Sequence, residues 1–224
     1  MLSYEQLWSA IEAYNIGIFP AQFVLLILGI VFTVWLLIKP DKLINIIVKA
    51  YFAFCFALAG IVLFLLFVPG LLISYLMSLL LLAVAALFFV DIFWNKIEFR
   101  RPERGRLLWI TILFLFLIFL YPVAGMLVGH HYPASIMLGA LPCPSSALAL
   151  VLLAAAIPRV MRTLYILLLL DAVPFPLLLI PLYGVFEDLI MFAAGVFALI
   201  MLIVKWKDIE REQAKGTAGS EDYQ

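Results

Sequence analysis

Charge is scarce in this 224-residue chain: only 12% of its residues are charged, whereas 67% are hydrophobic. An ordinary soluble domain has about 25% charged residues, so this composition excludes that class of protein. Basic and acidic residues are equal in number, which leaves no positive excess with which to bind nucleic acid. The composition therefore predicts an all-α integral membrane protein that crosses the bilayer several times.

Histidine and cysteine are also rare, with two of each in the whole chain. Cys55 and Cys143 show none of the spacings that are typical of a disulfide framework or a zinc site. No segment resembles a nucleotide-binding loop or the motifs of a hydrolase triad. These absences disfavour an enzyme, and the sequence indicates no particular cofactor.

The first 19 residues contain no Lys or Arg, so they lack the basic region of a cleavable signal peptide, and we expect them to be retained. Apolar side chains recur there at helical spacing. They are Tyr4, Leu7, Trp8 and Ile11. This pattern predicts that residues 1–19 form an amphipathic helix on the outer membrane surface.

Seven apolar runs follow, each close to the roughly 20 residues that cross about 30 Å of hydrocarbon. They occupy residues 21–38, 45–67, 71–94, 107–128, 144–160, 161–182 and 186–204. We therefore expect a seven-helix transmembrane domain over residues 20–207. Residues 208–224 are polar and charged, which predicts a disordered cytoplasmic tail.

The distribution of basic residues supports this number of helices. If seven helices alternate in direction, all 14 Lys and Arg residues fall on one side of the membrane and none on the other. With six or eight helices, Lys and Arg residues would fall on both sides of the membrane. Because cytoplasmic loops collect Lys and Arg, we expect the N-terminus outside and the C-terminus in the cytoplasm.

The segment 129–145, GHHYPASIMLGALPCPS, holds both histidines, Cys143 and three of the 12 prolines. The helix after it, from Pro144 to Pro158, would be only about 22 Å long, which is shorter than the hydrocarbon layer. Residues 134–141 are too apolar for a solvated loop and too few to span. We expect a re-entrant segment that encloses a pocket. Lipid cannot hydrogen-bond the N–H and C=O groups of non-helical backbone, so protein or a water-filled cavity must surround this segment. A loop resting on the outer leaflet is the alternative.

Asp171 lies near the middle of the sixth predicted helix, just before two prolines, Pro174 and Pro176. A carboxylate at this depth raises the free energy of membrane insertion by about 2.5–3.5 kcal/mol, so we expect it to face the bundle interior. There it would serve either a function or a hydrogen bond between helices. Pro122 should kink the fourth predicted helix, as Pro174 and Pro176 should break the sixth. Glu187 and Asp188 open the seventh helix, either as ligands or as capping anions.

The run YPxxGxxxGHxYPxxxxxGxxPCPS, from Tyr121 to Ser145, resembles the signature of a family of bacterial integral membrane proteins of unknown function. The motif YNxxxxPAQ at residues 14–22 and the segment 185–188 are similar to that family too. Its members often have Thr where Ser145 stands, and both residues carry a hydroxyl. The resemblance implies no activity, but it draws attention to His130, Tyr132, Pro133, Cys143, Glu187 and Asp188.

Together these patterns favour a transporter or channel for a small solute or ion, with an outward-facing pocket inside the membrane. Asp171 would carry a proton or bind a cation, and His130 would relay protons to the outer surface. The candidate pathway residues are Tyr121, His130, Tyr132, Cys143, Ser145, Asp171, Glu187 and Asp188.

Two other functions remain open. A membrane-embedded metal or redox protein would use His130, Cys143 and Asp188 as ligands, and a scaffold or sensor would use its polar groups only for packing. The expected partners are the lipid bilayer and a small solute or ion, with a homo-oligomer also open, and the expected location is the bacterial cytoplasmic membrane.

Overall fold

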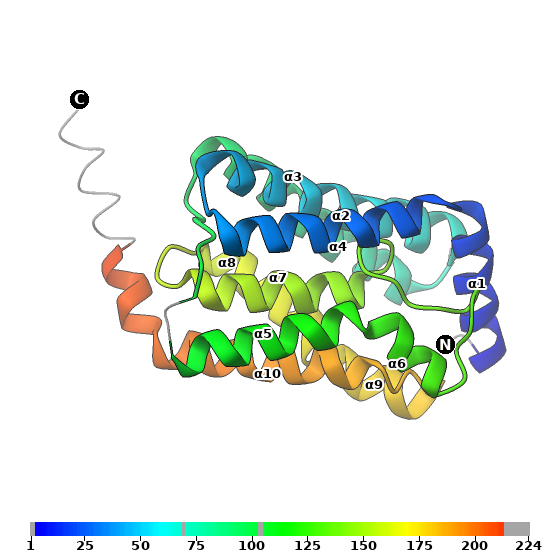
Figure 1. Cartoon of the computed structure of the whole chain (residues 1–224). Coiled ribbons are helices and arrows are strands. Elements are labelled where there is room, and N and C mark those ends of the chain that lie inside the picture. The colour runs from blue at the N-terminus through cyan, green and yellow to red at the C-terminus, as the bar shows by residue number, and fades with distance from the viewer. Residues whose placement is uncertain (1–2, 69, 103–104, 213–224) are drawn as a thin grey trace.

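The computed structural model describes residues 3–68, 70–102 and 105–212, and this part of the chain contains helices but no β-strand (Figure 1). The helices are α1 (Tyr4–Gly17), α2 (Ala21–Ile38), α3 (Lys42–Leu58), the π-helix η1 (Ala59–Phe67), α4 (Leu72–Trp94), α5 (Arg106–Phe119), α6 (Tyr121–Leu127), α7 (Pro142–Ala156), α8 (Arg162–Ala172), α9 (Pro174–Tyr183) and α10 (Asp188–Val204). The predicted all-α fold is confirmed.

Four helical segments are long and apolar enough to cross a membrane, and six are if each of two bent pairs counts as one span. The four are Ala21–Ile38, Lys42–Phe67, Leu72–Trp94 and Arg162–Tyr183. The bent pairs are α5 with α6, and α10 with residues Trp206–Glu212. The remaining predicted run, the fifth one at residues 144–160, corresponds to α7, which has only 15 residues. The count of seven spans stays a prediction.

Prolines divide two of the predicted helices where the sequence indicated. The chain bends by 58° between α5 and α6, and Pro122 occupies the first turn of α6. Val173 separates α8 from α9, and Pro174 begins α9. A proline lacks the amide donor of a helix interior but fits the first turn, so each of these residues lies in the first turn of the helix that follows the break.

The bundle has a basic end, drawn at the left of Figure 1. There α2, α4, α7 and α10 end, and α3, α5 and α8 begin, so the basic residues that border these helices gather at one end. Arg104 and Lys215 lie outside the described residues. The opposite end carries α1, α6, α9 and the connection from α6 to α7. One boundary at the basic end differs from expectation: residues 206–212 are helical, although a disordered tail was predicted from residue 208. The rest of that tail lies outside the described part.

An ion pair buried between α3 and α4 holds the basic end together. Lys49 Nζ lies 2.8 Å from Asp91 Oδ2, and both side chains are almost wholly inaccessible. The amine also donates to Asn95 Oδ1 at 3.2 Å. The carboxylate of Asp91 accepts from the backbone amides of Lys96 and Ile97, at 2.8 and 3.1 Å. Both charges are therefore compensated, and the chain after α4 is fixed to the helix end.

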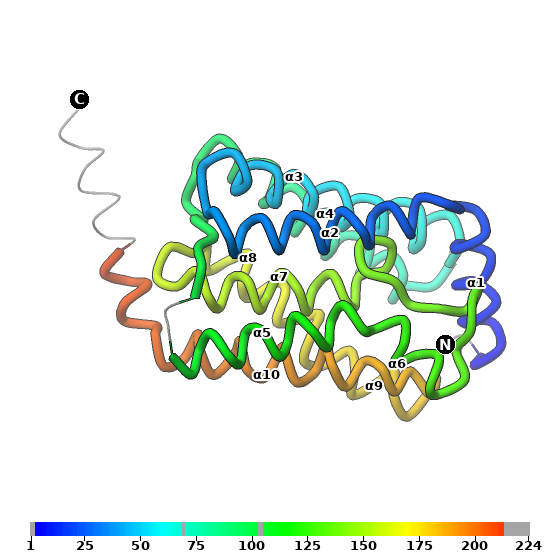
Figure 2. The backbone as a smooth tube through the Cα atoms, in the orientation of Figure 1, coloured from blue at the N-terminus to red at the C-terminus, as the bar shows by residue number. Residues whose placement is uncertain are grey.

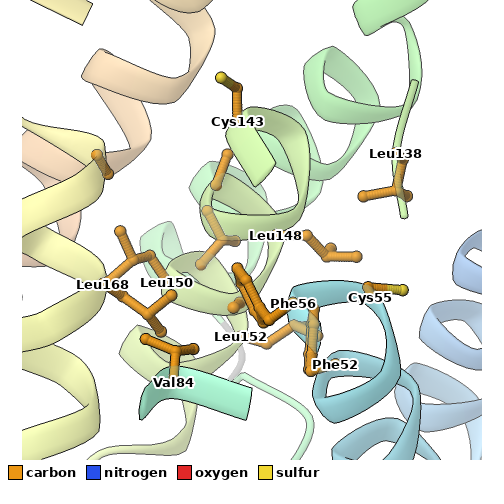
Figure 3. Packing of buried hydrophobic residues seen from close by; sticks show 14 of the residues in the cluster. Phe52, Cys55, Phe56, Val84, Leu138, Cys143, Leu148, Leu150, Leu152 and Leu168 are labelled. Atoms are coloured by element: carbon orange, nitrogen blue, oxygen red, sulfur yellow. The ribbon is translucent and has the colours of Figure 1, made fainter. Parts of the chain in front are cut away.

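The centre of the bundle is α7, all of whose residues are buried. It packs against α10, α8, α5 and α3. Figure 3 shows Leu148 and Leu152 of α7 close to Phe52 and Phe56 of α3, with Leu150 on the side of Leu168 from α8. A helix that is apolar on every side is typical of a protein core, so the other helices separate α7 from lipid.

The outer faces of the surrounding helices are apolar as well. Leu79, Leu66 and Ile203 each expose about two thirds of their surface, and exposed Leu, Ile and Phe side chains extend along most of the outer helices. Soluble proteins rarely expose apolar patches of this extent. This surface is that of a membrane protein, in agreement with the composition.

Replacing Lys49 by Met should lower the free energy of unfolding by about 3–5 kcal/mol, because it leaves the carboxylate of Asp91 buried without its counter-charge. Titration with a denaturing detergent in mixed micelles would measure this. The matched control is Lys39→Met, which breaks the exposed Lys39–Asp41 pair at 3.7 Å and should cost about 0–1 kcal/mol. Equal effects of the two substitutions would contradict a stabilising role for the buried pair.

Candidate functional site

The chain between α6 and α7 turns back into the bundle beside α1 and α2 (Figure 2). Residues 133–141, named here the buried loop, form no helix, and those from Ser135 onward are buried. Its carbonyl groups find donors on α1: Tyr14 Oη donates to Ala140 O at 2.7 Å, and Asn15 Nδ2 donates to the oxygens of Pro133 and Ser135 at 2.6 and 2.8 Å. Protein therefore covers the non-helical backbone, as a re-entrant segment requires.

The buried loop fits closely because it contains a glycine. Gly139 has a φ of +83°, and a Cβ atom there would come within 2.7 Å of Tyr51 Oη and 2.8 Å of Leu25 Cβ. Its amide donates to Ser145 Oγ at 3.0 Å, and the same hydroxyl donates to Leu141 O at 2.9 Å. Ser145 thus fastens the buried loop to α7, which begins at Pro142, two residues earlier than predicted.

The buried face of α1 includes Trp8 and Ile11 of the predicted apolar face and extends to two polar residues that the prediction left out. Trp8, Ile11, Tyr14 and Asn15 are buried, whereas Tyr4 is 52% exposed. The helix packs against η1 and α9 across the end of the bundle. Two of its polar side chains, those of Tyr14 and Asn15, point inward, so α1 does more than rest on a surface: it supplies hydrogen bonds to the buried loop.

A pocket of about 260 Å³ lies between α1, η1, α4, α7 and α9. Most of its wall is apolar and includes Leu7, Ile11, Leu63, Met77, Phe175 and Leu179. Three groups that can carry charge also line it: Cys143, Asp171 and Asp188. The sequence predicted a polar pocket, but the structure shows an apolar pocket whose polar groups are few.

The polar side of this apolar pocket is a carboxyl cluster, made of Tyr121, Cys143, Ser146, Asp171 and Asp188. Ser146 Oγ donates to Asp171 Oδ2 at 2.6 Å, and Tyr121 Oη donates to Asp188 Oδ1. Cys143 lies close enough to interact electrostatically with both carboxyl groups. Four elements, α6, α7, α8 and α10, thus bring their polar residues to one place.

Asp188 leaves one oxygen of this cluster without a partner. Its Oδ2 atom is buried and accepts no hydrogen bond from any described residue, although the residue lines the apolar pocket. Neither Asp171 nor Asp188 forms an ion pair within the described ranges. A buried carboxylate that has no counter-charge and one oxygen without a donor is costly, so this oxygen is available to a proton or to a bound cation or donor group.

A second polar pair lies next to the carboxyl cluster. His130 Nδ1 is 2.9 Å from Glu187 Oε1, and both side chains are nearly buried. The ring of Trp8 lies against the imidazole, with the two ring centres 3.8 Å apart. Gly125 makes room for the acid, because a Cβ atom there would stand 3.2 Å from Glu187 Oε1. Glu187 directly precedes Asp188, so the pair and the cluster are adjacent.

The structure brings together four of the predicted pathway residues: Tyr121, Cys143, Asp171 and Asp188. His130 and Glu187 lie beside them, but two others do not contribute. Tyr132 is 43% exposed and packs against Phe19 and Phe23, away from the apolar pocket. Ser145 binds the buried loop, as described above.

Residues that the sequence did not single out as site residues are Tyr14, Asn15 and Ser146. Tyr14 and Asn15 open the YNxxxxPAQ motif, which is a signal that could have found them, and Ser146 is a polar residue near the start of the apolar stretch that forms α7. For the metal alternative, His130 contacts Glu187 rather than Cys143 or Asp188, and nowhere in the described chain do three His, Cys, Asp or Glu side chains gather to hold one ion. The geometry therefore gives the metal site no support.

A family model with the description "Family of unknown function (DUF6064)" matches residues 4–213. The chain belongs to this family. The match extends from α1 to the helix at residues 206–212, so the carboxyl cluster, the buried loop and α1 all lie within the DUF6064 region. No curated protein and no solved structure matches the chain.

Replacing Gly139 by Ala in this DUF6064 protein should destabilise it by about 1–3 kcal/mol more than replacing Gly129 by Ala. Both glycines have positive φ, at +83° and +102°, so both substitutions strain the backbone. Only the Gly139 methyl group would collide with neighbours, since nothing lies within 4 Å of a Cβ atom at Gly129. Thermal unfolding in detergent would compare the two, and equal midpoints would show that the buried loop is loosely packed.

Proposed function

We propose that this DUF6064 protein is a membrane transporter for a small solute, which binds in the apolar pocket with its polar group against Asp171 and Asp188. The observation that carries the proposal is the buried, unpartnered Oδ2 atom of Asp188 at the pocket wall. Ionisable groups inside a membrane bundle are costly, and they commonly mark substrate, ion or proton pathways.

The chemistry of the pocket indicates the class of solute. Apolar walls favour a solute with an apolar body, and the carboxyl cluster favours a cationic or hydrogen-bond-donating group on it. The volume of about 260 Å³ suits a small molecule. We therefore infer a small amphipathic cation as the substrate.

A proton and such a cation would compete for the same carboxyl group. When the solute leaves, Asp188 must be neutralised by a proton, because a buried carboxylate without a counter-charge is unfavourable. Exchange of one for the other couples solute movement to proton movement. His130 and Glu187, next to Asp188 and beneath Trp8, would carry protons between the cluster and the outside.

We further propose seven spans, with the N-terminus outside and the C-terminus in the cytoplasm of a bacterial cell, in its cytoplasmic membrane. In this topology α7 is the fifth span, and the buried loop completes its passage on the outer side. The basic end of the bundle faces the cytoplasm, which agrees with the preference of Lys and Arg for that side.

Cysteine labelling tests this topology. In a chain with Cys55→Ala and Cys143→Ala, an impermeant maleimide added to intact cells should label Glu12→Cys but not Lys207→Cys, until the membrane is opened. Both positions are exposed, one in α1 and one beyond α10. Seven spans place the two on opposite sides of the membrane, whereas an even number places them on the same side, so equal labelling would contradict seven spans.

Proton exchange tests the function. In proteoliposomes that contain a pH-sensitive dye, external benzyltrimethylammonium should drive protons out of the vesicle, since this cation has an apolar ring and a fixed charge. Asp188→Asn should abolish the exchange because the neutral amide cannot trade a proton for a cation, and Asp171→Asn should weaken it.

The matched control is Glu12→Gln, which removes an exposed carboxylate of α1 at the same end of the bundle and should leave exchange unchanged. Elution of each variant as a single peak in size-exclusion chromatography would verify that it is folded. Exchange by Asp188→Asn equal to that of the unaltered chain would refute the role of Asp188, and the absence of any cation-dependent proton movement would refute the proposed exchange.

A further inference from the structure

A second pocket lies at the basic end, far from the carboxyl cluster along α7. It has a volume of about 380 Å³ and is named here the basic pocket. Its polar lining comes from the chain before α5 and from the end of α10 and the helix after it: Arg100, Arg101, Lys205, Asp208, Arg211 and Glu212. Its apolar lining comes from α5, α7 and α10 and includes Leu107, Ala154, Ala155 and Met201.

The acidic residues of the basic pocket are already paired. Asp208 Oδ2 lies 3.3 Å from Lys205 Nζ, and Glu212 Oε1 accepts from Arg159 Nε at 3.1 Å. Arg100, Arg101 and Arg211 form no ion pair with any residue the structure describes. Three guanidinium groups thus line one pocket without an acidic partner in the described part of the chain.

Arg100 is the most constrained of the three. Its Nη2 atom donates to Ala156 O, the last residue of α7, at 3.3 Å. Its Nε–H is buried and has no acceptor among the described residues. A buried donor without an acceptor is unfavourable, so this atom indicates that an acceptor binds in the basic pocket.

We propose that the basic pocket binds the phosphate group of an anionic phospholipid. Phosphate oxygens accept paired hydrogen bonds from guanidinium groups, which matches the arginine-rich lining. Helix α5 begins and α7 and α10 end here, where the apolar bundle would emerge from the membrane, so the headgroup would meet the arginines while Leu107 and Met201 would contact the glycerol and upper acyl chains. Basic pockets between helices at this level are suited to anionic headgroups.

A lipid source accounts for the apolar wall better than free phosphate does. Free phosphate is fully hydrated and gains nothing from contact with the partly exposed side chains of Leu107 and Met201. A phospholipid uses both kinds of surface in one molecule. The inference is independent of the transport proposal, because it concerns other residues at the other end of the bundle.

Native mass spectrometry of the full chain in detergent tests the proposal with three probes: phosphatidylglycerol, phosphatidylcholine and inorganic phosphate. Phosphatidylglycerol should bind at a defined stoichiometry and more tightly than phosphatidylcholine. The double variant Arg101→Gln/Arg211→Gln should weaken this binding at least tenfold. Both residues are exposed, so their replacement spares the buried contacts of the fold.

The matched control is Arg106→Gln/Lys207→Gln, which removes two exposed charges from the same end of the protein but outside the basic pocket. It should bind phosphatidylglycerol as the unaltered chain does. A third variant, Arg100→Lys, keeps the charge but loses the guanidinium fork, and it should also bind more weakly.

Equal loss of binding in the two double variants would overturn the proposal, since it would show attraction by net charge alone. Failure of the unaltered chain to bind phosphatidylglycerol would overturn it as well. Full displacement of the lipid by millimolar inorganic phosphate would overturn the lipid assignment and identify free phosphate as the ligand. Loss of phosphatidylglycerol binding only in Arg101→Gln/Arg211→Gln, with no displacement of the lipid by inorganic phosphate, would establish the site.

Discussion

The structure depends on satisfying the backbone of the buried loop. Non-helical chain inside an apolar bundle leaves amides and carbonyls that neither lipid nor apolar side chains can bind, and each such group costs several kcal/mol. Tyr14 and Asn15 supply donors to three of these carbonyls, and Ser145 binds an amide and a fourth carbonyl. Without these contacts α7 could not start where it does, and Cys143 and Ser146 would not reach Asp188 and Asp171.

Helix α7 also connects the two ends of the protein. Its first turn contributes Cys143 and Ser146 to the carboxyl cluster, and its last turn contributes Ala154 and Ala155 to the basic pocket. Because every residue of α7 is buried, it cannot shift without disturbing the helices packed around it. The two pockets therefore share one rigid element, even though their ligands would differ in charge and in origin.

Local sequence patterns predicted the parts of the fold that local physics controls. Pro122 and Pro174 located the breaks, the basic residues located one end, and the carboxylates Asp171 and Asp188 among apolar residues located the cluster. The role of α1 could not be predicted in this way. Helical spacing indicated an apolar face, but the partner of Tyr14 is 126 residues away and leaves no local trace. The exposed position of Tyr132 and the fastening role of Ser145 likewise depend on which distant surface each one meets.

The partners of α1 have a consequence for biosynthesis. The acceptors of Asn15, Tyr14 and Trp8 lie 118, 126 and 175 residues further along the chain. A ribosome makes α1 first, so its inward face must wait, exposed or in temporary contacts, until the segment up to Tyr183 has been inserted. Assembly would therefore finish at the N-terminal helix, and the apolar pocket would acquire its last wall only after almost the whole chain has been translated.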